Sequence, residues 1–461
     1  MQPLLAVLLL LAASTSSTAG TTTGATAGGA ATGAATGTAR AHERRLRRGL
    51  QAGAELERRQ ELRQASAHYA ALLSASGGAA PSEALLGAHT AAGRVSRQLK
   101  RHDGAYGHHE AALRLRGSLG AIAESYLLAF TQMATDRFLA GRFVEARELL
   151  RTADTQFAAQ LAPDGAALLQ RMRAFVCECQ GEYGEAAALL RRSRELLPAA
   201  GPRQRLDDLL LQRQCVRRQR LSLPLRSGGA LRAEEAALDA QLLTAGPWST
   251  VLQMPAEYDP GLAARAVPWP RIGDFPALQR LVDALESPAL VSSLAAEYAD
   301  LKAKGLLQRD QDCIQSKSGA AQWSRFELSG VWNLRGAERC SKETPVACEL
   351  QARLRAMLVV PVLRVGYSAV QRGAWIRPHF GRTNRQLKLH LGVKVPSGDC
   401  AWMRVGEERR AWQTGRVSFL DDSWEHEVRN ECRAERVVLQ VVVEHPSLSL
   451  KPLEYAPLVE E

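Results

Sequence analysis

The chain has 461 residues, of which 46% are hydrophobic and 23% are charged. This composition is that of globular proteins and excludes a chain disordered throughout, and the length is sufficient for two or three domains. The net charge of +11 comes from arginines scattered through amphipathic segments without an aromatic–basic motif, so we expect no nucleic-acid partner.

The first twenty residues are typical of a targeting segment. The apolar run Pro3–Ala13 is too short for a membrane span, which needs roughly 20 residues, and small residues follow it. We therefore expect a cleaved signal peptide over residues 1–20, with a signal anchor that tethers the chain to a membrane as the alternative. Residues 21–49 are predicted to be a low-complexity linker, whose basic end, Arg40–Arg48, opens the first helix.

Residues 50–221 are predicted to form helical repeats. They are rich in Ala, Leu, Arg and Glu, which favour helix. A glycine and an aromatic residue recur before Glu-Ala pairs in Gly104-Ala105-Tyr106, Gly141-Arg142-Phe143 and Gly181-Glu182-Tyr183. This pattern resembles tetratricopeptide repeats, although the glycine spacings are longer than their period of about 34 residues. Such a region either presents a groove to a protein partner or acts as a helical spacer.

Residues 222–270 contain several Pro and Gly residues and are predicted to be a connector with one helix near Ala233–Leu243. Two further helices are expected within Phe275–Gly305, the second opening at Ser287-Pro288. All eight Trp lie at or after Trp248, which indicates that a second architecture follows the helical one.

Beyond Val359 the hydrophobic period changes to two, which predicts strands. Because no helical pattern separates them, we expect an antiparallel jelly roll. The predicted strands are Val359–Val370, Trp375–His379, Lys388–Val395, Arg416–Leu420 and Arg436–Glu444.

The eight cysteines include no CxxC pair, so a structural zinc site is not expected. Cys340 and Cys348 are close enough to close a small loop. We interpret four further cysteines as packed thiols; these are Cys177, Cys179, Cys400 and Cys432.

Two histidines stand in distinctive places. His379 ends a predicted strand and His426 follows a turn. Non-haem oxygenases commonly hold iron with two His and a carboxylate, the first His and the carboxylate being two residues apart. Gly381 occupies that carboxylate position here, and spacing alone therefore favours ordinary core histidines over a metal site.

Residues 270–448 nevertheless resemble the aspartyl/asparaginyl β-hydroxylase family, which has a glycine at that position. The resemblance implies an α+β multidomain chain, with the N-terminal α-helical repeats followed by a double-stranded β-helix (jelly-roll) domain over residues 271–450 and a C-terminal tail at 451–461. The segments that carry it are Trp375–Asn384, Leu389–Pro396, Trp412 with Gly415, Asp421–Val428, and Arg436 with the strand to His445-Pro446.

The resemblance also implies a cofactor site for Fe(II), 2-oxoglutarate and O2. His379 and His426 match the iron-binding and catalytic histidines, with water in the place of a carboxylate. Ser368, His390 and Arg436 match 2-oxoglutarate-binding positions. Lys388 departs from the family's usual Arg but shares a strand face with His390, and Arg429 replaces an aromatic residue. We expect four acidic residues to fix the turn and orient His426; these are Asp421, Asp422, Glu425 and Glu427.

The function that the resemblance implies is hydroxylation of the β-carbon of Asp or Asn in protein substrates, in particular secreted disulfide-rich domains. The expected location is the secretory pathway, in the endoplasmic reticulum lumen, with the chain soluble or membrane-anchored. The alternatives are a 2-oxoglutarate oxygenase acting on another peptide, a small molecule or a lipid, and a non-catalytic repeat scaffold. A zinc hydrolase is disfavoured because the sequence has no HExxH motif.

Overall fold

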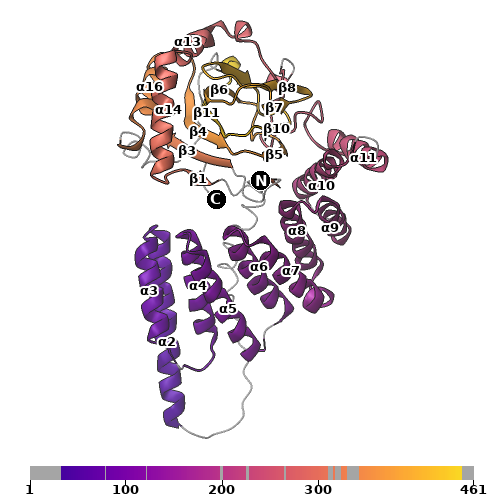
Figure 1. Cartoon of the computed structure of the whole chain (residues 1–461). Coiled ribbons are helices and arrows are strands. Elements are labelled where there is room, and N and C mark those ends of the chain that lie inside the picture. The colour runs from indigo at the N-terminus through magenta and orange to yellow at the C-terminus, as the bar shows by residue number, and fades with distance from the viewer. Residues whose placement is uncertain are drawn as a thin grey trace. The chain divides into compact units, whose positions relative to one another are not determined.

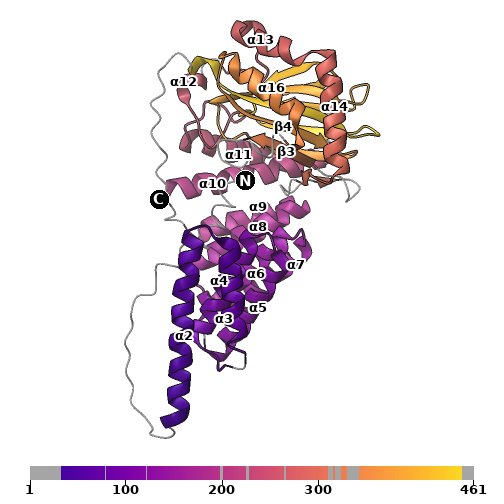
Figure 2. The same ribbon diagram turned by 90° about the vertical axis from the view of Figure 1, so that its left-hand side faces the viewer.

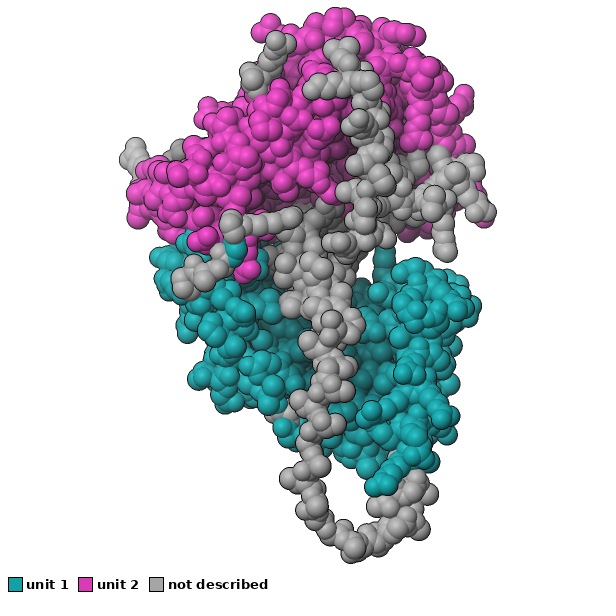
Figure 3. Space-filling model, turned by 180° about the vertical axis from the view of Figure 1, so that it is seen from behind, with its two compact units in different colours: residues 1–201 teal, residues 202–461 magenta. Residues whose placement is uncertain are grey.

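A computed structural model describes residues 33–448, apart from 78, 121, 198–200, 225–227, 264–265, 310–314, 317–322 and 330–341. The chain divides between Gly201 and Pro202 into two compact units (Figure 1, Figure 3). The predicted targeting segment and C-terminal tail lie outside the described residues. Within the described ranges, no helix is both long and apolar enough to cross a membrane.

The first unit is built of helices that pack on their neighbours in the chain (Figure 1). The predicted linker 21–49 is wrong from Gly33 onward, because the Ala- and Arg-rich sequence continues as helix and buries Leu46. The helices are α2 Gly33–Arg58, α3 Leu62–Ser74, α4 Glu83–Gln98, α5 His102–Ser118, α6 Ala123–Leu139, α7 Phe143–Phe157, α8 Pro163–Gln180 and α9 Tyr183–Leu196, with a 3-10 turn at Ala158–Gln160.

The helical repeat is confirmed, but its register differs from the predicted one. Gly104 lies inside α5, and the residue equivalent to Gly141 and Gly181 is Lys100, which also has a positive φ. At each such turn the next residue's N–H bonds back to a carbonyl five positions earlier, a helix-ending motif that needs a left-handed residue. A fully buried alanine follows five residues after each turn. The equivalent turns are Gln60, Lys100, Gly141 and Gly181, and the alanines are Ala65, Ala105, Ala146 and Ala186.

The second unit begins with helices. Its first helix, α10, was predicted to end the repeat region, but it belongs to this unit, so the predicted boundary at 221 is wrong by one helix. The predicted helices in the connector and in Phe275–Gly305 are present, and Ser287 is the N-cap of α14. The helices are α10 Pro202–Ser222, α11 Gly229–Ala245, α12 Pro260–Ala263, α13 Pro276–Leu285, α14 Pro288–Ala303 and α16 Pro345–Ala356, with 3-10 turns at Ile272–Asp274 and Pro446–Leu448.

Two antiparallel sheets complete the second unit and confirm the double-stranded β-helix. The larger has the order β1-β3-β4-β11-β6-β9 and the smaller β2-β5-β10-β7-β8. The strands are β1 Gln308–Arg309, β2 Gln315–Ser316, β3 Trp323–Ser329, β4 Val362–Val370, β5 Ala374–His379, β6 Gln386–Lys394, β7 Ala401–Val405, β8 Glu408–Ala411, β9 Val417–Leu420, β10 His426–Asn430 and β11 Arg436–Glu444.

The larger sheet has two buried faces with different neighbours. Its outer face, which includes Val365 and Tyr367 of β4, packs against α13, α14 and α16 (Figure 2). Its inner face contributes Val370 and Val438 to an apolar cluster with the smaller sheet. Because side chains alternate along a strand, the remaining inner positions are free to carry polar residues, and the candidate site lies there.

Candidate functional site

The two predicted iron ligands meet across neighbouring strands. His379 ends β5, His426 begins β10, and the two residues are paired in the antiparallel register. The centroids of their rings are 4.1 Å apart. The next pair along is Val428 with Ile376, so β5 has one more residue than β10 in this interval. Such a bulge re-aims a side chain, and here it lets His379 share the inner face with His426 while Ile376 and Val428 remain in the core.

Both imidazoles are held in the same way. The Nδ1 of His379 is 2.7 Å from the carbonyl oxygen of Arg377, and the Nδ1 of His426 is 2.9 Å from that of Trp424. A carbonyl only accepts, so each Nδ1 carries the proton and each Nε2 keeps a free lone pair. Burial lowers the pKa of His426 to about 4 and also lowers that of His379. Both rings are therefore neutral at physiological pH, which is the form that binds metals.

Gly381 leaves no room for a third protein ligand. A Cβ at this position would lie 2.5 Å from Oδ2 of Asp422 and 2.7 Å from its backbone oxygen. The Asp422 carboxylate is in turn paired with Lys388, at 2.6 Å between Oδ2 and Nζ. Across the ranges that the structure covers, no group of three His, Cys, Asp or Glu side chains is arranged to hold a metal. A metal at this place would thus have two protein ligands and open positions.

Beside the histidines, three buried donors lie together, on Arg436, His390 and Trp412. The Arg436 guanidinium lies 4.2 Å from the centroid of the Trp412 ring and its Nη1 donates to the carbonyl oxygen of Ser368. His390 lies near the same ring, and Gln440 donates to its Nε2, so Nδ1 carries the proton. No hydrogen-bond acceptor among the described residues reaches Arg436 Nε, His390 Nδ1 or Trp412 Nε1. Unpaired buried donors are costly, and these three donors together suit an anion. Within the described residues an acceptor, Oδ1 of Asp422, is also left unpaired beside the histidines, although its other carboxylate oxygen is paired with Lys388.

The electrostatics of this region agree with an anion site. Arg436 is 2% exposed, and burial lowers its pKa to about 9, so the side chain still carries its charge at neutral pH. Ser368 is also buried, and its hydroxyl accepts a hydrogen bond from Trp323. Lys388 lies on the same strand face as His390, as expected, while Leu389 and Leu391 face the opposite core.

The acidic residues around His426 hold the turn and its neighbours. Asp421 accepts from the backbone N–H of Ser423 at 2.9 Å. Glu427 accepts from Trp375 and from Arg404, both at 2.7 Å. Glu425 is enclosed by arginines, among them two from α10 that the sequence analysis did not single out.

The predicted connector 222–270 is more than a spacer. Gln253 forms a β-bridge with Trp424 and donates to Ser423 at 2.8 Å. Asp259 exchanges two hydrogen bonds with Asn384, just after His379. The connector therefore contacts both the turn before His426 and the segment that follows His379. The only signal of this in the sequence is the presence of the polar residues Gln253 and Asp259 within a Pro-rich segment.

The prediction that Cys400 and Cys432 are packed thiols is wrong, because they form a disulfide that links the start of β7 to the end of β10. The prediction is wrong for Cys179 as well, because it is disulfide-bonded, whereas Cys177 is a buried thiol as predicted. Cys348 is also disulfide-bonded. Cys340, the predicted partner of Cys348, lies outside the described residues.

Comparison with known proteins identifies the β-sheet domain. The family model for Aspartyl/Asparaginyl beta-hydroxylase matches residues 290–446. The Aspartyl/asparaginyl beta-hydroxylase of Mus musculus is 32% identical over 34% of this chain and 20% of that protein. Aspartate beta-hydroxylase domain-containing protein 2 of Homo sapiens is 33% identical over 28% of this chain and 35% of that protein. The match thus spans about a fifth to a third of the relatives' length.

Solved structures overlap with each unit. YrrB, a TPR protein with an unusual peptide-binding site, covers 43% of this chain and 88% of its own, at 15% identity and a TM-score of 0.29. A Pseudomonas putida prolyl-4-hydroxylase covers 37% of this chain and 100% of its own, at 22% identity and a TM-score of 0.26.

The second unit contains a double-stranded β-helix of two antiparallel sheets. Its residues 290–446 are a domain of the aspartyl/asparaginyl β-hydroxylase family, a family of 2-oxoglutarate-dependent hydroxylases. The structure brings the six predicted site residues together in the interior between the two sheets, but the roles assigned to them remain predictions; these residues are His379, His426, Ser368, Lys388, His390 and Arg436.

Proposed function

We propose that this chain is an Fe(II)- and 2-oxoglutarate-dependent dioxygenase that hydroxylates the β-carbon of Asp or Asn residues in proteins. The observation that carries the proposal is the pairing of two neutral imidazoles, each with a free Nε2, with a neighbouring set of buried donors that lack acceptors among the described residues. A two-histidine donor set with open positions fits ferrous iron, and the unpaired donors fit a dicarboxylate.

When bound, iron, 2-oxoglutarate and O2 supply the oxidising chemistry that hydroxylates an unactivated carbon. The residues of this chain bind and orient. His379 and His426 hold the metal through Nε2. Arg436 would pair with a carboxylate of 2-oxoglutarate by charge-assisted hydrogen bonds, and His390 would donate from Nδ1. The apolar cluster of the two sheets closes the inner end of the site and excludes water.

A protein substrate is supported by the family of the matched domain, whose relatives are named for aspartyl and asparaginyl hydroxylation, and by the helical repeats, which commonly bind proteins. We propose secreted, disulfide-rich domains as substrates and the endoplasmic reticulum lumen as the location. The disulfide between Cys400 and Cys432 supports an oxidising compartment. Protease protection of the chain in sealed microsomes tests this location, and full digestion without detergent would contradict it.

The activity is tested by succinate release from 2-oxoglutarate in the presence of Fe(II), ascorbate and candidate peptides. We expect His379→Ala and His426→Ala to abolish both succinate release and metal binding. His445→Ala is the matched control and should retain both, because the ring of this histidine of the same domain accepts from the Ser447 backbone N–H and packs against Phe275. Full succinate release by both site variants would refute the assignment.

A further inference from the structure

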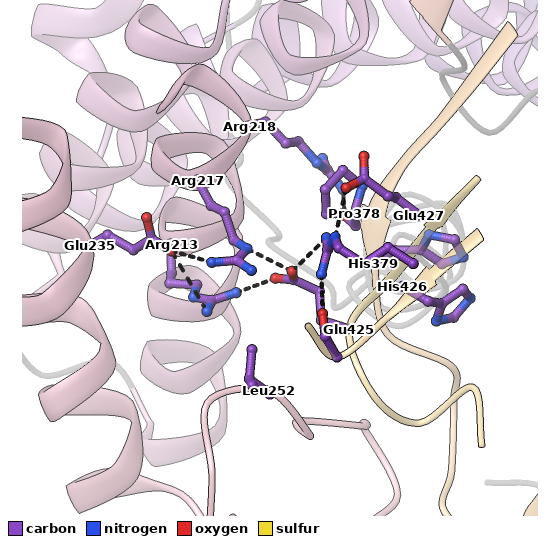
Figure 4. A network of polar contacts seen from close by, with 12 residues as sticks. Arg213, Arg217, Arg218, Glu235, Leu252, Pro378, His379, Glu425, His426 and Glu427 are labelled. Carbon is purple, nitrogen blue, oxygen red and sulfur yellow. Dashed lines mark hydrogen bonds and ion pairs between the residues drawn. The ribbon is translucent and has the colours of Figure 1, made fainter. Parts of the chain in front are cut away.

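The arginines of α10 converge on the residue that precedes the second histidine. Arg213 and Arg217 are four positions apart and therefore share a helix face. Figure 4 shows both pointing toward Glu425: Arg213 Nη1 and Arg217 Nε donate to its two carboxylate oxygens, the latter at 2.6 Å. Glu425 is 1% exposed, so these ion pairs are buried inside the second unit.

Glu425 is fixed from every side. Arg404 of β7 donates to the same carboxylate at 3.0 Å. The backbone N–H of Glu425 donates to the carbonyl oxygen of Leu252 at 2.7 Å, and its carbonyl oxygen accepts from Gly406 at 2.9 Å. Since His426 is the next residue, any displacement of Glu425 is transmitted directly to the backbone that aims the His426 ring.

The same helix also reaches the residue that precedes the first histidine. Arg218 Nη2 donates to the carbonyl oxygen of Pro378 at 2.7 Å (Figure 4). Pro378 lies in the β5 bulge and has no paired residue on β10. The sheet register therefore does not fix the residue before His379, whereas the bond from Arg218 does.

We propose that Arg217 and Arg218, together with Arg213, are positioning residues for the metal ligands His379 and His426. This inference rests on the proposed function. It makes α10 part of the metal site, although this helix precedes the family-matched residues 290–446. One helix then positions the backbone before both histidines, whose rings must face the same metal ion. Ligand-orienting partners of this kind change metal affinity by about 10- to 100-fold when they are removed.

Arg220 provides a matched control on the same helix. It donates to Glu235 at 2.6 Å, and Arg217 donates to Glu235 at 2.8 Å as well. Arg220→Gln therefore removes an ion pair with the same partner, but within the described residues Arg220 forms no hydrogen bond with Glu425 or Pro378, the residues that precede the histidines. A purely structural role for the helix predicts similar effects for Arg217→Gln and Arg220→Gln.

The experiment titrates Co(II) into the purified full chain and follows the dissociation constant and the visible ligand-field spectrum, with the melting temperature measured in parallel. We expect Arg217→Gln and Arg218→Gln to weaken Co(II) binding by about 10- to 100-fold and to alter the spectrum. Arg220→Gln should bind Co(II) as the unmodified chain does. Arg217→Lys, which keeps the charge, should recover part of the affinity.

Equal Co(II) affinity and spectra in Arg217→Gln, Arg218→Gln and Arg220→Gln would overturn the inference while leaving the proposed function intact, provided that His379→Ala abolishes Co(II) binding. A chain in which His379→Ala leaves Co(II) binding unchanged would instead refute the metal site itself, and the inference with it.

Discussion

Two regions of the second unit bury arginine in opposite ways. On the α10 side of the smaller sheet, Arg213 is fully buried and is paired with Glu425 and Asp239. In the interior between the sheets, Arg436 is almost as deeply buried, yet in the described part of the chain no carboxylate pairs with it, and it contacts a carbonyl and an indole face.

The difference separates a structural charge from one that is kept for a ligand. A buried cation is costly unless opposite charge and hydrogen bonds compensate for its loss of water. Arg213 obtains that compensation within the chain. Among the described residues Arg436 has no such compensation, and burial lowers its pKa to about 9, which fits a position whose compensating anion is a bound ligand.

The largest effect expected from this comparison is that of Arg213→Met. Removing this cation leaves Asp239 and one oxygen of the buried Glu425 without their partner. Breaking a buried ion pair costs about 3–5 kcal/mol, and we expect a loss of this size in the free energy of unfolding measured with urea. A loss no greater than that of an exposed arginine, such as Arg409→Met, would show that the α10 network adds no stability.

Removing the disulfide between Cys400 and Cys432 should affect the stability of the chain without affecting cosubstrate binding. The disulfide closes a loop with a sequence separation of 32 residues, and replacing both cysteines by serine should lower the free energy of unfolding by about 3–4 kcal/mol on the chain-entropy account. Because the pair lies at the ends of β7 and β10 away from His426, at the start of β10, the KM for 2-oxoglutarate should stay unchanged. A large rise in KM would mean that this end of the smaller sheet shapes the site.

Arg436→Met should behave in the opposite way to Arg213→Met. The substitution removes an uncompensated buried charge and places a thioether against Trp412, so the melting temperature without cosubstrate should be equal or higher. The KM for 2-oxoglutarate should rise roughly 10- to 100-fold, because charge-assisted hydrogen bonds are lost. The stabilisation that 2-oxoglutarate gives the unmodified chain with Mn(II) should disappear. A melting temperature as low as that of Arg213→Met would contradict the comparison.

The sequence predicts the region between the two sheets, around Arg436, better than the region where α10 packs on the smaller sheet, around Arg213. Strand periodicity places Lys388 and His390 on one face, and the motif around His379 and His426 brings the rings together. These are local patterns, with a period of two residues or a short run of identities. The strand β10 was missed because it carries two charged residues, Glu427 and Arg429, where a hydrophobic pattern was sought. Glu427 is paired with Arg404 on the neighbouring strand β7 and with Arg429 on its own strand.

Contacts between residues far apart in the sequence could not be predicted from the sequence. The residues Arg213 and Glu425 are 212 positions apart, and an arginine on a helix that already carries many gives no sign of which one is buried. The bulge that turns His379 inward is a property of strand pairing, not of composition. The disulfide likewise depends on β7 and β10 being neighbours, which requires the fold to be known first.

The smallest expected effect is that of substituting Lys388. This residue shares features with both Arg213, which is paired within the chain, and Arg436, which faces the candidate cosubstrate site. Its ammonium is paired with the buried Asp422, as Arg213 is with its carboxylates, but it also lies on the strand face of His390. Burial opposes the charge of Asp422, yet Lys388 and other cations lower its pKa overall. Lys388→Arg supplies a guanidinium that can keep the ion pair with Asp422 and also donate a hydrogen bond to a second carboxylate.

We therefore expect Lys388→Arg to lower the KM for 2-oxoglutarate by about threefold, the scale of one added exposed ion-pair interaction, with little change in kcat. Lys388→Met is the matched control and should raise KM and reduce stability, because Asp422 is left charged and unpaired. If Lys388→Arg leaves KM unchanged while Lys388→Met only reduces stability, then Lys388 belongs with Arg213 as a structural charge, and the cosubstrate is held by Arg436 and His390 without it.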